Sequence, residues 1–224
     1  MKIKAKNPNK WDLLYGEKKS WFAKLEETAI NWYFAKVFGK SIMAIHHVKN
    51  GRILESGCGS GAISMKLSEH NNEIILLDLS PNALARAISN FRKSSIDCKF
   101  VITDLFKMPF GDNQFDIVFN QGVMEHFKIT GVDPTLGIKE MLRVVKQNGI
   151  LVISVPAYFS PLHIIYLFFK IFGLVEKFWP YEDQEFSHKK ELFQMLKAGG
   201  CTNIKVRRIW SSLFFSLIGY CKKE

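Results

Sequence analysis

The sequence predicts an α/β protein with a mostly parallel, Rossmann-like sheet and helices on both faces. Three observations indicate this class: apolar runs alternate with helical stretches, a glycine-rich turn follows the first run, and an aspartate ends the second. The chain has 224 residues and 47% apolar content, enough for one full hydrophobic core. Because no repeat or Pro/Gly/Ser-rich linker divides it, we expect one α/β domain with additions at its ends.

The glycine-rich turn is the most informative segment. Arg52–Glu55 has the apolar content of a short buried strand, and Ala62–Ser68 has helical spacing of apolar residues. Between them lie Gly57, Gly59 and Gly61. At such a junction a ligand can approach bare backbone N–H groups at a helix N-terminus. A tight connection without a ligand is the alternative for this turn taken alone.

The second strand supports a nucleoside site. Glu73–Leu77 is an apolar run that ends at Asp78, and Ser80-Pro81 then caps and opens a helix. In a βαβ unit an acid about 20 residues after the loop lies beside the ribose of a bound cofactor. Asp78 is therefore a candidate for ribose binding, with a solvated acid at a strand end as the alternative.

The remaining elements continue the alternation. We expect strands near Cys98–Ile102, Phe115–Phe119 and Ile150–Val155, and helices at Pro81–Lys93 and Leu136–Val145. After Pro156 a long aromatic stretch precedes a helix at about His188–Ala198. Two strand-like runs follow, Thr202–Trp210 and Leu213–Cys221, joined by a Ser-Ser turn, and they predict a hairpin at one sheet edge.

Several motifs resemble one family in both order and spacing. They are Glu55–Gly61, Asp78, Thr103–Leu105, Phe115–Asn120 and Leu142–Gly149. The sequence is similar to the class I S-adenosylmethionine-dependent methyltransferases, type 11 branch, most densely over about residues 50–156. This resemblance implies a seven-stranded sheet of order 3-2-1-4-5-7-6 with the seventh strand antiparallel. Residues 1–48 would form an N-terminal helical cap, and residues 49–224 the methyltransferase domain, with a variable lid at about 157–186.

The resemblance also implies the cofactor-binding residues. Glu55 would hold loop amides and face the ammonium group of S-adenosylmethionine, while the glycines leave room for its methionine moiety. Asp78 would accept from the ribose hydroxyls, and Asp104 from the adenine amino group. The other expected cofactor-binding residues are Gly57, Cys58, Gly59, Gly61, Leu79, Leu105, Asn120, Gln121 and Tyr15. As alternatives, Asp104 is a helix cap and Asn120 a turn former. The reaction product would be S-adenosylhomocysteine.

Methyl transfer from a sulfonium needs positioning and exclusion of water, and it needs a base only when the acceptor is protonated. The candidate catalytic residues are Glu125 and His126, which follow the fourth strand on the acceptor side. A structural role for His126, capping or packing a helix, is the alternative. Tyr158 and His163 are further candidates on the acceptor side.

Substrate choice is expected to reside in Ala157–Trp179. No charged residue occurs from Gln147 to Phe169, but glycine and proline interrupt this run, so we reject a transmembrane helix. Leu162–Trp179 is either an amphipathic lid that touches a bilayer or an apolar acceptor, or a helix packed on its own domain. The aromatic residues of the segment are Tyr158, Phe159, Tyr166, Phe168, Phe169, Phe172, Phe178 and Trp179.

Charge and cysteines add weaker information. The net charge is +10 and the pI about 9.4, with lysines concentrated at the N-terminus, which suits anionic lipid or nucleic acid. Nucleic acid is disfavoured because no binding motif is present. Four cysteines without metal-ligand spacing predict no metal site, and a lysine-rich N-terminus does not resemble a signal peptide. We expect reduced thiols in a cytoplasmic protein, with peripheral membrane contact left open.

The sequence thus predicts an S-adenosylmethionine-dependent methyltransferase that acts on a small or lipid-like acceptor. Two alternatives remain open. Gly57–Ala62 also satisfies the dinucleotide pattern Gly-x-Gly-x-x-Ala, which is compatible with an NAD(P)-dependent oxidoreductase. Glu55 before the loop, Asp104 after the third strand and the expected lack of a proton-relay pair such as Tyr-x-x-x-Lys count against an oxidoreductase. A non-catalytic S-adenosylmethionine-binding subunit is the second alternative.

Overall fold

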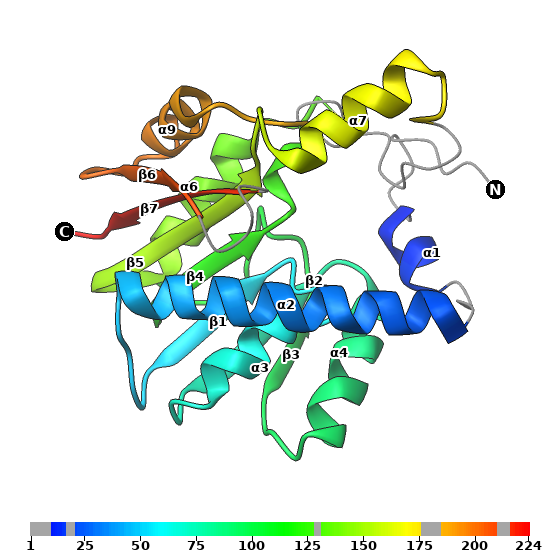
Figure 1. Cartoon of the computed structure of the whole chain (residues 1–224). Coiled ribbons are helices and arrows are strands. Elements are labelled where there is room, and N and C mark those ends of the chain that lie inside the picture. The colour runs from blue at the N-terminus through cyan, green and yellow to red at the C-terminus, as the bar shows by residue number, and fades with distance from the viewer. Residues whose placement is uncertain (1–9, 17–20, 128–130, 176–184, 210–215) are drawn as a thin grey trace.

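The computed structural model describes residues 10–16, 21–127, 131–175, 185–209 and 216–224 (Figure 1). Its strands form one seven-stranded sheet of order β3-β2-β1-β4-β5-β7-β6. They are β1 (Arg52–Ser56), β2 (Glu73–Asp78), β3 (Lys99–Ile102), β4 (Phe115–Gln121), β5 (Val145–Pro156), β6 (Lys205–Arg208) and β7 (Ser216–Lys222). The strands β1 to β5 pair in parallel, while β7 is antiparallel to both β5 and β6. The fold class and strand order predicted from the sequence are confirmed.

Helices cover both faces of this sheet. They are α1 (Lys10–Gly16), α2 (Trp21–Ile45), α3 (Ala62–Ser68), α4 (Pro81–Lys93), α6 (Pro134–Val144), α7 (Pro161–Ile171), α9 (Lys189–Ala198) and the 3-10 helix η1 (Met124–His126). Figure 1 shows α2, α3 and α4 on one face, with α6 and α9 on the other. The core consequently has two layers, and successive strand residues alternate between them. Ile53 packs with α2 and α3, whereas its neighbour Leu54 packs with α6 and α9.

Local sequence signals explain where these helices begin. The Ser80 hydroxyl accepts from the Ala83 N–H at 3.1 Å, and Pro81 occupies the first helical position of α4. The Asp133 carboxylate caps α6 in the same way, with the Thr135 N–H at 2.9 Å. Both helices therefore start where the sequence supplies an acceptor followed by proline.

Some predicted boundaries shift. Strand β5 begins at Val145 rather than Ile150, because Phe115 pairs with Val145 across a register shift in the β4–β5 ladder. The helix predicted at Leu136–Val145 begins two residues earlier, at its Pro134. The Ser-Ser turn of the terminal hairpin falls within residues 210–215, outside the described residues. So do Phe178 and Trp179 of the predicted lid, and α7 is its described helix.

The sheet topology determines where a site can form. Because β1, β2, β4 and β5 are parallel, their carboxyl ends meet at one edge of the sheet. The glycine loop, Asp78, Asn120 and the start of α7 each follow one of these ends.

Within the described part of the chain, no helix is long and apolar enough to cross a membrane.

Candidate functional site

The glycine loop after β1 is held in a conformation that favours glycine. Gly57, Gly59 and Gly61 have φ values of 76°, 51° and 70°. A Cβ at Gly57 would lie 2.6 Å from Val123 Cγ2, and one at Gly59 would collide with the Tyr15 hydroxyl. The N–H groups of Gly57 and Cys58 both donate to the Leu77 carbonyl, at 2.8 and 3.0 Å. The loop is therefore fixed to the end of β2, and side chains pack closely over two of its glycines.

Asp78 lies beside this loop. Its Oδ2 accepts from the Gly59 N–H and its Oδ1 from the Ser80 N–H, both at 2.9 Å. Partial burial raises the pKa of Asp78, although these backbone hydrogen bonds oppose the shift. Each carboxylate oxygen can accept a further hydrogen bond, so two ligand hydroxyls can be bound here. Next to it the apolar side chains of Leu79 and Ile102 are 53% and 62% exposed.

Two buried acceptor atoms flank the glycine loop. Neither Glu55 Oε2 at the end of β1 nor Asn120 Oδ1 on β4 has a hydrogen-bond partner among the described residues. The Asn120 amide group itself donates to the Ser56 carbonyl, which orients the side chain. Burial raises the pKa of Glu55 to about 8. A ligand with N–H donors and a positive charge would satisfy both atoms and favour the ionised carboxylate.

Helix α1 lies across the loop and is attached to the N-terminus of α4. Asp12 Oδ1 accepts from the Ser80 hydroxyl and from the Asn82 N–H, both at 2.9 Å. The Arg86 guanidinium stands 5.3 Å from the centre of the Tyr15 ring, and this ring brings its hydroxyl over Gly59. These contacts make α1 one wall of the site beside the glycine loop.

Glu125 and His126 lie on η1, which follows β4 at the same sheet edge. Both side chains are buried. The His126 ring meets the Trp11 ring of α1 edge to face, with centroids 4.7 Å apart. A Cβ at Gly122 would lie 3.8 Å from Glu125 Oε1, which places this carboxylate next to the turn after β4. The structure thus places the two candidate catalytic residues beside the end of β4, where Asn120 and the half-buried Gln121 also lie.

Other predicted residues lie less centrally. Asp104 is exposed, and its Oδ1 accepts from the Phe106 N–H at 3.0 Å in a local turn, where no helix begins. Leu105 is buried in the core against Gly137, and Ile102 instead presents an exposed apolar side chain near β2. Tyr158 and His163 belong to an aromatic cluster in which the Tyr158 ring stacks on His188, with centroids 4.3 Å apart.

Sequence reasoning missed Asp12, Arg86 and Ile102. Asp12 and Arg86 matter because α1 docks on α4, a tertiary contact that no local pattern encodes. Ile102 ends a predicted strand, and its exposure beside the Asp78 strand follows from the β2–β3 register.

The predicted absence of a metal site stays a prediction: the described residues contain no cluster of His, Cys, Asp or Glu that could hold a metal ion.

Comparison with known proteins identifies the fold and a methyltransferase domain within the chain. Residues 54–153 match the family model of a methyltransferase domain. They form a class I S-adenosylmethionine-dependent methyltransferase domain. The methyltransferase domain thus covers the glycine loop, Asp78, Asp104, Asn120 and Glu125.

Individual proteins extend the likeness beyond that domain. A demethylmenaquinone methyltransferase of Staphylococcus aureus is 28% identical over 209 residues, 84% of each chain. An uncharacterized methyltransferase of Schizosaccharomyces pombe is 33% identical over 110 residues, and the match spans only 38% of that relative. The crystal structure of magnesium protoporphyrin IX methyltransferase from Synechocystis PCC 6803 with bound S-adenosylhomocysteine superposes with a TM-score of 0.68. It shares 16% identity and covers 96% of this chain and 93% of its own.

These findings give no support to the oxidoreductase or to the non-catalytic subunit. The chain contains the Tyr-x-x-x-Lys spacing twice, at Tyr15–Lys19 and at Tyr166–Lys170, so the expectation that it lacks such a proton-relay pair is wrong. Both spacings lie outside the matched domain, the second of them on α7. The sequence, the fold and the relatives therefore all indicate a methyltransferase domain with S-adenosylmethionine as its cofactor.

Proposed function

We propose that this chain transfers the methyl group of S-adenosylmethionine to a small, lipid-like acceptor at the carboxyl edge of the sheet. The observation that carries the proposal is the pair of unpaired buried acceptors, Glu55 Oε2 and Asn120 Oδ1, on either side of the glycine loop. S-adenosylmethionine carries an ammonium group that suits them, and it supplies a methyl group activated on a sulfonium. Asp78 ends the neighbouring strand β2 and lies beside the glycine loop, where it could bind the nucleoside part of the same ligand.

Each residue then has a binding role. Glu55 would face the ammonium group, and Asp78 would accept from both ribose hydroxyls. Leu79 and Ile102 would contact the adenine, and Asp104 would accept from its amino group. The remaining cofactor contacts come from Gly57, Cys58, Gly59, Gly61, Asn120, Gln121 and Tyr15, with Leu105 supporting the adenine side from the core.

The N-terminal segment, residues 1–48, would act as the cap of the site. Its helix α1 brings Tyr15 over Gly59 of the glycine loop and Trp11 against His126, which follows β4. Such a cover excludes water and holds donor and acceptor in line, which is most of what this reaction requires. For an acceptor that must lose a proton, Glu125 and His126 are the bases in reach of the end of β4.

The acceptor assignment comes from the Staphylococcus aureus relative, whose name gives demethylmenaquinone as its substrate. It also agrees with the variable segment at about 157–186, whose described part exposes large apolar side chains at Phe159, Ile164 and Phe168. A lid of this composition suits an apolar acceptor better than a charged one. Radiolabelled methyl should therefore pass to organic-soluble acceptors, such as quinones, in preference to water-soluble amines, and the reverse preference would refute this assignment.

The cofactor site is tested by Asp78→Ala. Loss of charge-assisted hydrogen bonds to the ribose should weaken S-adenosylhomocysteine binding by at least ~1.5 kcal/mol in calorimetry. Asp97→Ala is the matched control, because Asp97 is an exposed aspartate just before β3, at the opposite edge of the sheet. An unchanged dissociation constant in folded Asp78→Ala protein would refute the ribose assignment.

A further inference from the structure

The outer face of α7 is apolar over its whole length. Its exposed side chains are Ile164, Ile165, Leu167, Phe168, Ile171 and Phe172, and we call this set the α7 apolar face. At 3.6 residues per turn these positions fall within an arc of about 160°. Ile171 is 78% exposed, and Phe172 and Phe168 are 61% and 52% exposed. Phe159, just before the helix, adds a further ring that is 74% exposed.

The inner face of α7 carries the more polar side chains. His163 is buried, and its Nδ1 accepts from the Phe159 N–H at 3.3 Å. Its ring and that of Tyr166 both contact Phe186, with centroids 4.8 and 5.4 Å apart. A surface helix that packs on its own domain normally has the opposite arrangement, with apolar residues inward and polar residues outward. The helix-on-domain alternative therefore does not account for α7.

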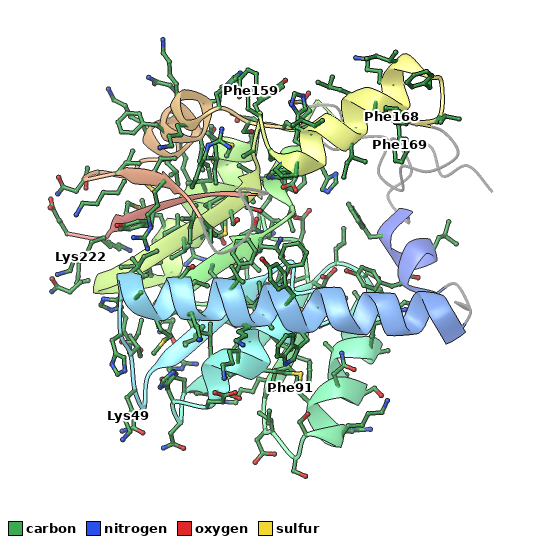
Figure 2. All side chains as sticks on the ribbon, in the orientation of Figure 1. Lys49, Phe91, Phe159, Phe168, Phe169 and Lys222 are labelled. Atoms are coloured by element: carbon green, nitrogen blue, oxygen red, sulfur yellow. The ribbon has the colours of Figure 1, made fainter. Side chains whose placement is uncertain are left out.

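This face lies at one end of the molecule. In Figure 1 α7 projects beyond the sheet, away from the α2–α4 layer, and Figure 2 shows Phe159, Phe168 and Phe169 far from Lys49 and Lys222. Exposed apolar patches of this kind mark interaction sites in stable proteins. Lys170 is the charged residue of α7, and it stands outside the apolar arc.

Charge decides between the occupants that such a face could take. A second copy of this chain would carry the same overall net charge of +10 and be repelled, whereas an anionic bilayer would attract the chain. Helix α7 has 11 residues, a length of about 16 Å, which is too short to cross the ~30 Å hydrocarbon core of a bilayer. An apolar face on a short helix is suited to lying in the plane of the membrane interface.

We propose that the α7 apolar face docks this protein on an anionic lipid bilayer, with its aliphatic and aromatic side chains inserted at the acyl boundary. The proposal deepens the proposed function and rests on it for the lipid-like acceptor. Strand β5 leads directly into α7, and its Ser154 pairs with Gln121 at the end of β4. Docking through α7 would therefore turn the acceptor side of the site towards the bilayer, and an apolar acceptor could reach it without crossing water.

Vesicle co-sedimentation tests the docking. The wild-type chain should bind vesicles of phosphatidylcholine with phosphatidylglycerol more strongly than phosphatidylcholine alone, and added salt should weaken the difference. The triple variant Phe168→Ser, Ile171→Ser, Phe172→Ser should lose at least tenfold in partitioning. A matched control replaces three exposed apolar residues elsewhere by serine, namely Val132, Leu136 and Phe193, and it should bind vesicles as the wild type does.

Two further readouts separate the possible failures. Anionic vesicles should slow amide hydrogen exchange in α7 of the wild type, and both variants should keep wild-type affinity for S-adenosylhomocysteine. Lack of vesicle binding by the wild type, or equal binding by the α7 variant, would overturn the docking proposal. So would light scattering that shows a wild-type dimer abolished by the α7 variant. Failure to bind S-adenosylhomocysteine would instead contradict the proposed function and leave the docking result standing.

Discussion

Glu55→Gln should stabilise the protein and weaken its cofactor binding. The carboxyl is buried at the end of β1, and burial raises its pKa from 4.5 to about 8. Because the folded pKa is the higher one, the folded state binds more protons than the unfolded state between these values. The contribution of Glu55 to the free energy of unfolding is thus fully present below pH 4.5. It is lost as the pH rises from 4.5 to about 8, and no more is lost above about pH 8.

The size of the effect follows from the shift. At ~1.36 kcal/mol per unit, the raised pKa of Glu55 lowers the free energy of unfolding by about 3 kcal/mol at pH 7 and by about 5 kcal/mol above pH 8, relative to acidic pH. Glutamine has the shape of the neutral acid and removes this cost. Urea unfolding at pH 5, 7 and 8.5 should show a wild-type free energy that falls relative to Glu55→Gln as the pH rises. A difference between the two proteins that stays constant with pH would refute the buried-charge reasoning.

Cofactor binding should follow the opposite trend. A bound ammonium group lowers the Glu55 pKa, so binding releases a proton and becomes tighter as the pH rises towards about 8. The affinity should then level off. In Glu55→Gln the affinity for S-adenosylhomocysteine should be weaker and lose this pH dependence. If calorimetry gives both proteins the same pH profile, Glu55 does not face the ammonium group.

Three other substitutions or treatments have defined outcomes. Asp104→Ala should weaken S-adenosylhomocysteine binding with little change in melting temperature, and a sharp fall in melting temperature at unchanged affinity would make this acid a structural cap. Asp12→Ala should release α1 from α4 and lower cofactor affinity by about 1 kcal/mol, with Asp12→Asn as the partial rescue; equal affinity in the alanine variant would exclude α1 from the site. The Cys201 and Cys221 sulfurs lie 2.6 Å apart, so mild oxidation should join them with loss of two hydrogens and add about 3 kcal/mol of stability. Thiol titration measures the joining, and unchanged thiol reactivity after oxidation would contradict it.

Much of the fold could be predicted because its signals are local. The glycine loop, the Asp78 strand end and the Ser80-Pro81 cap each lie within a few residues, and the helices α3 and α4 begin and end where the pattern placed them. The strand order came from resemblance to a family, since apolar periodicity alone does not specify which strands are neighbours.

The rest of the site depends on contacts between distant segments. Asp12 meets Ser80, and Trp11 meets His126, only because α1 folds back over the sheet edge. For the aromatic segment after Pro156 the sequence left two arrangements open, a lid or a helix packed on its own domain, and the exposure of Phe168 and Phe172 favours the lid. Which side of α7 faces outward could not be predicted, because its sequence is apolar on nearly every position and only packing against Phe186 distinguishes the faces.

Parallel calorimetric titrations with S-adenosylhomocysteine and with NAD test the central claim most directly. The unpaired Glu55 and Asn120 oxygens, together with Asp78, predict micromolar binding of S-adenosylhomocysteine and no measurable heat from NAD. Binding of NAD without binding of S-adenosylhomocysteine would contradict the account, because the glycine loop would then serve a dinucleotide.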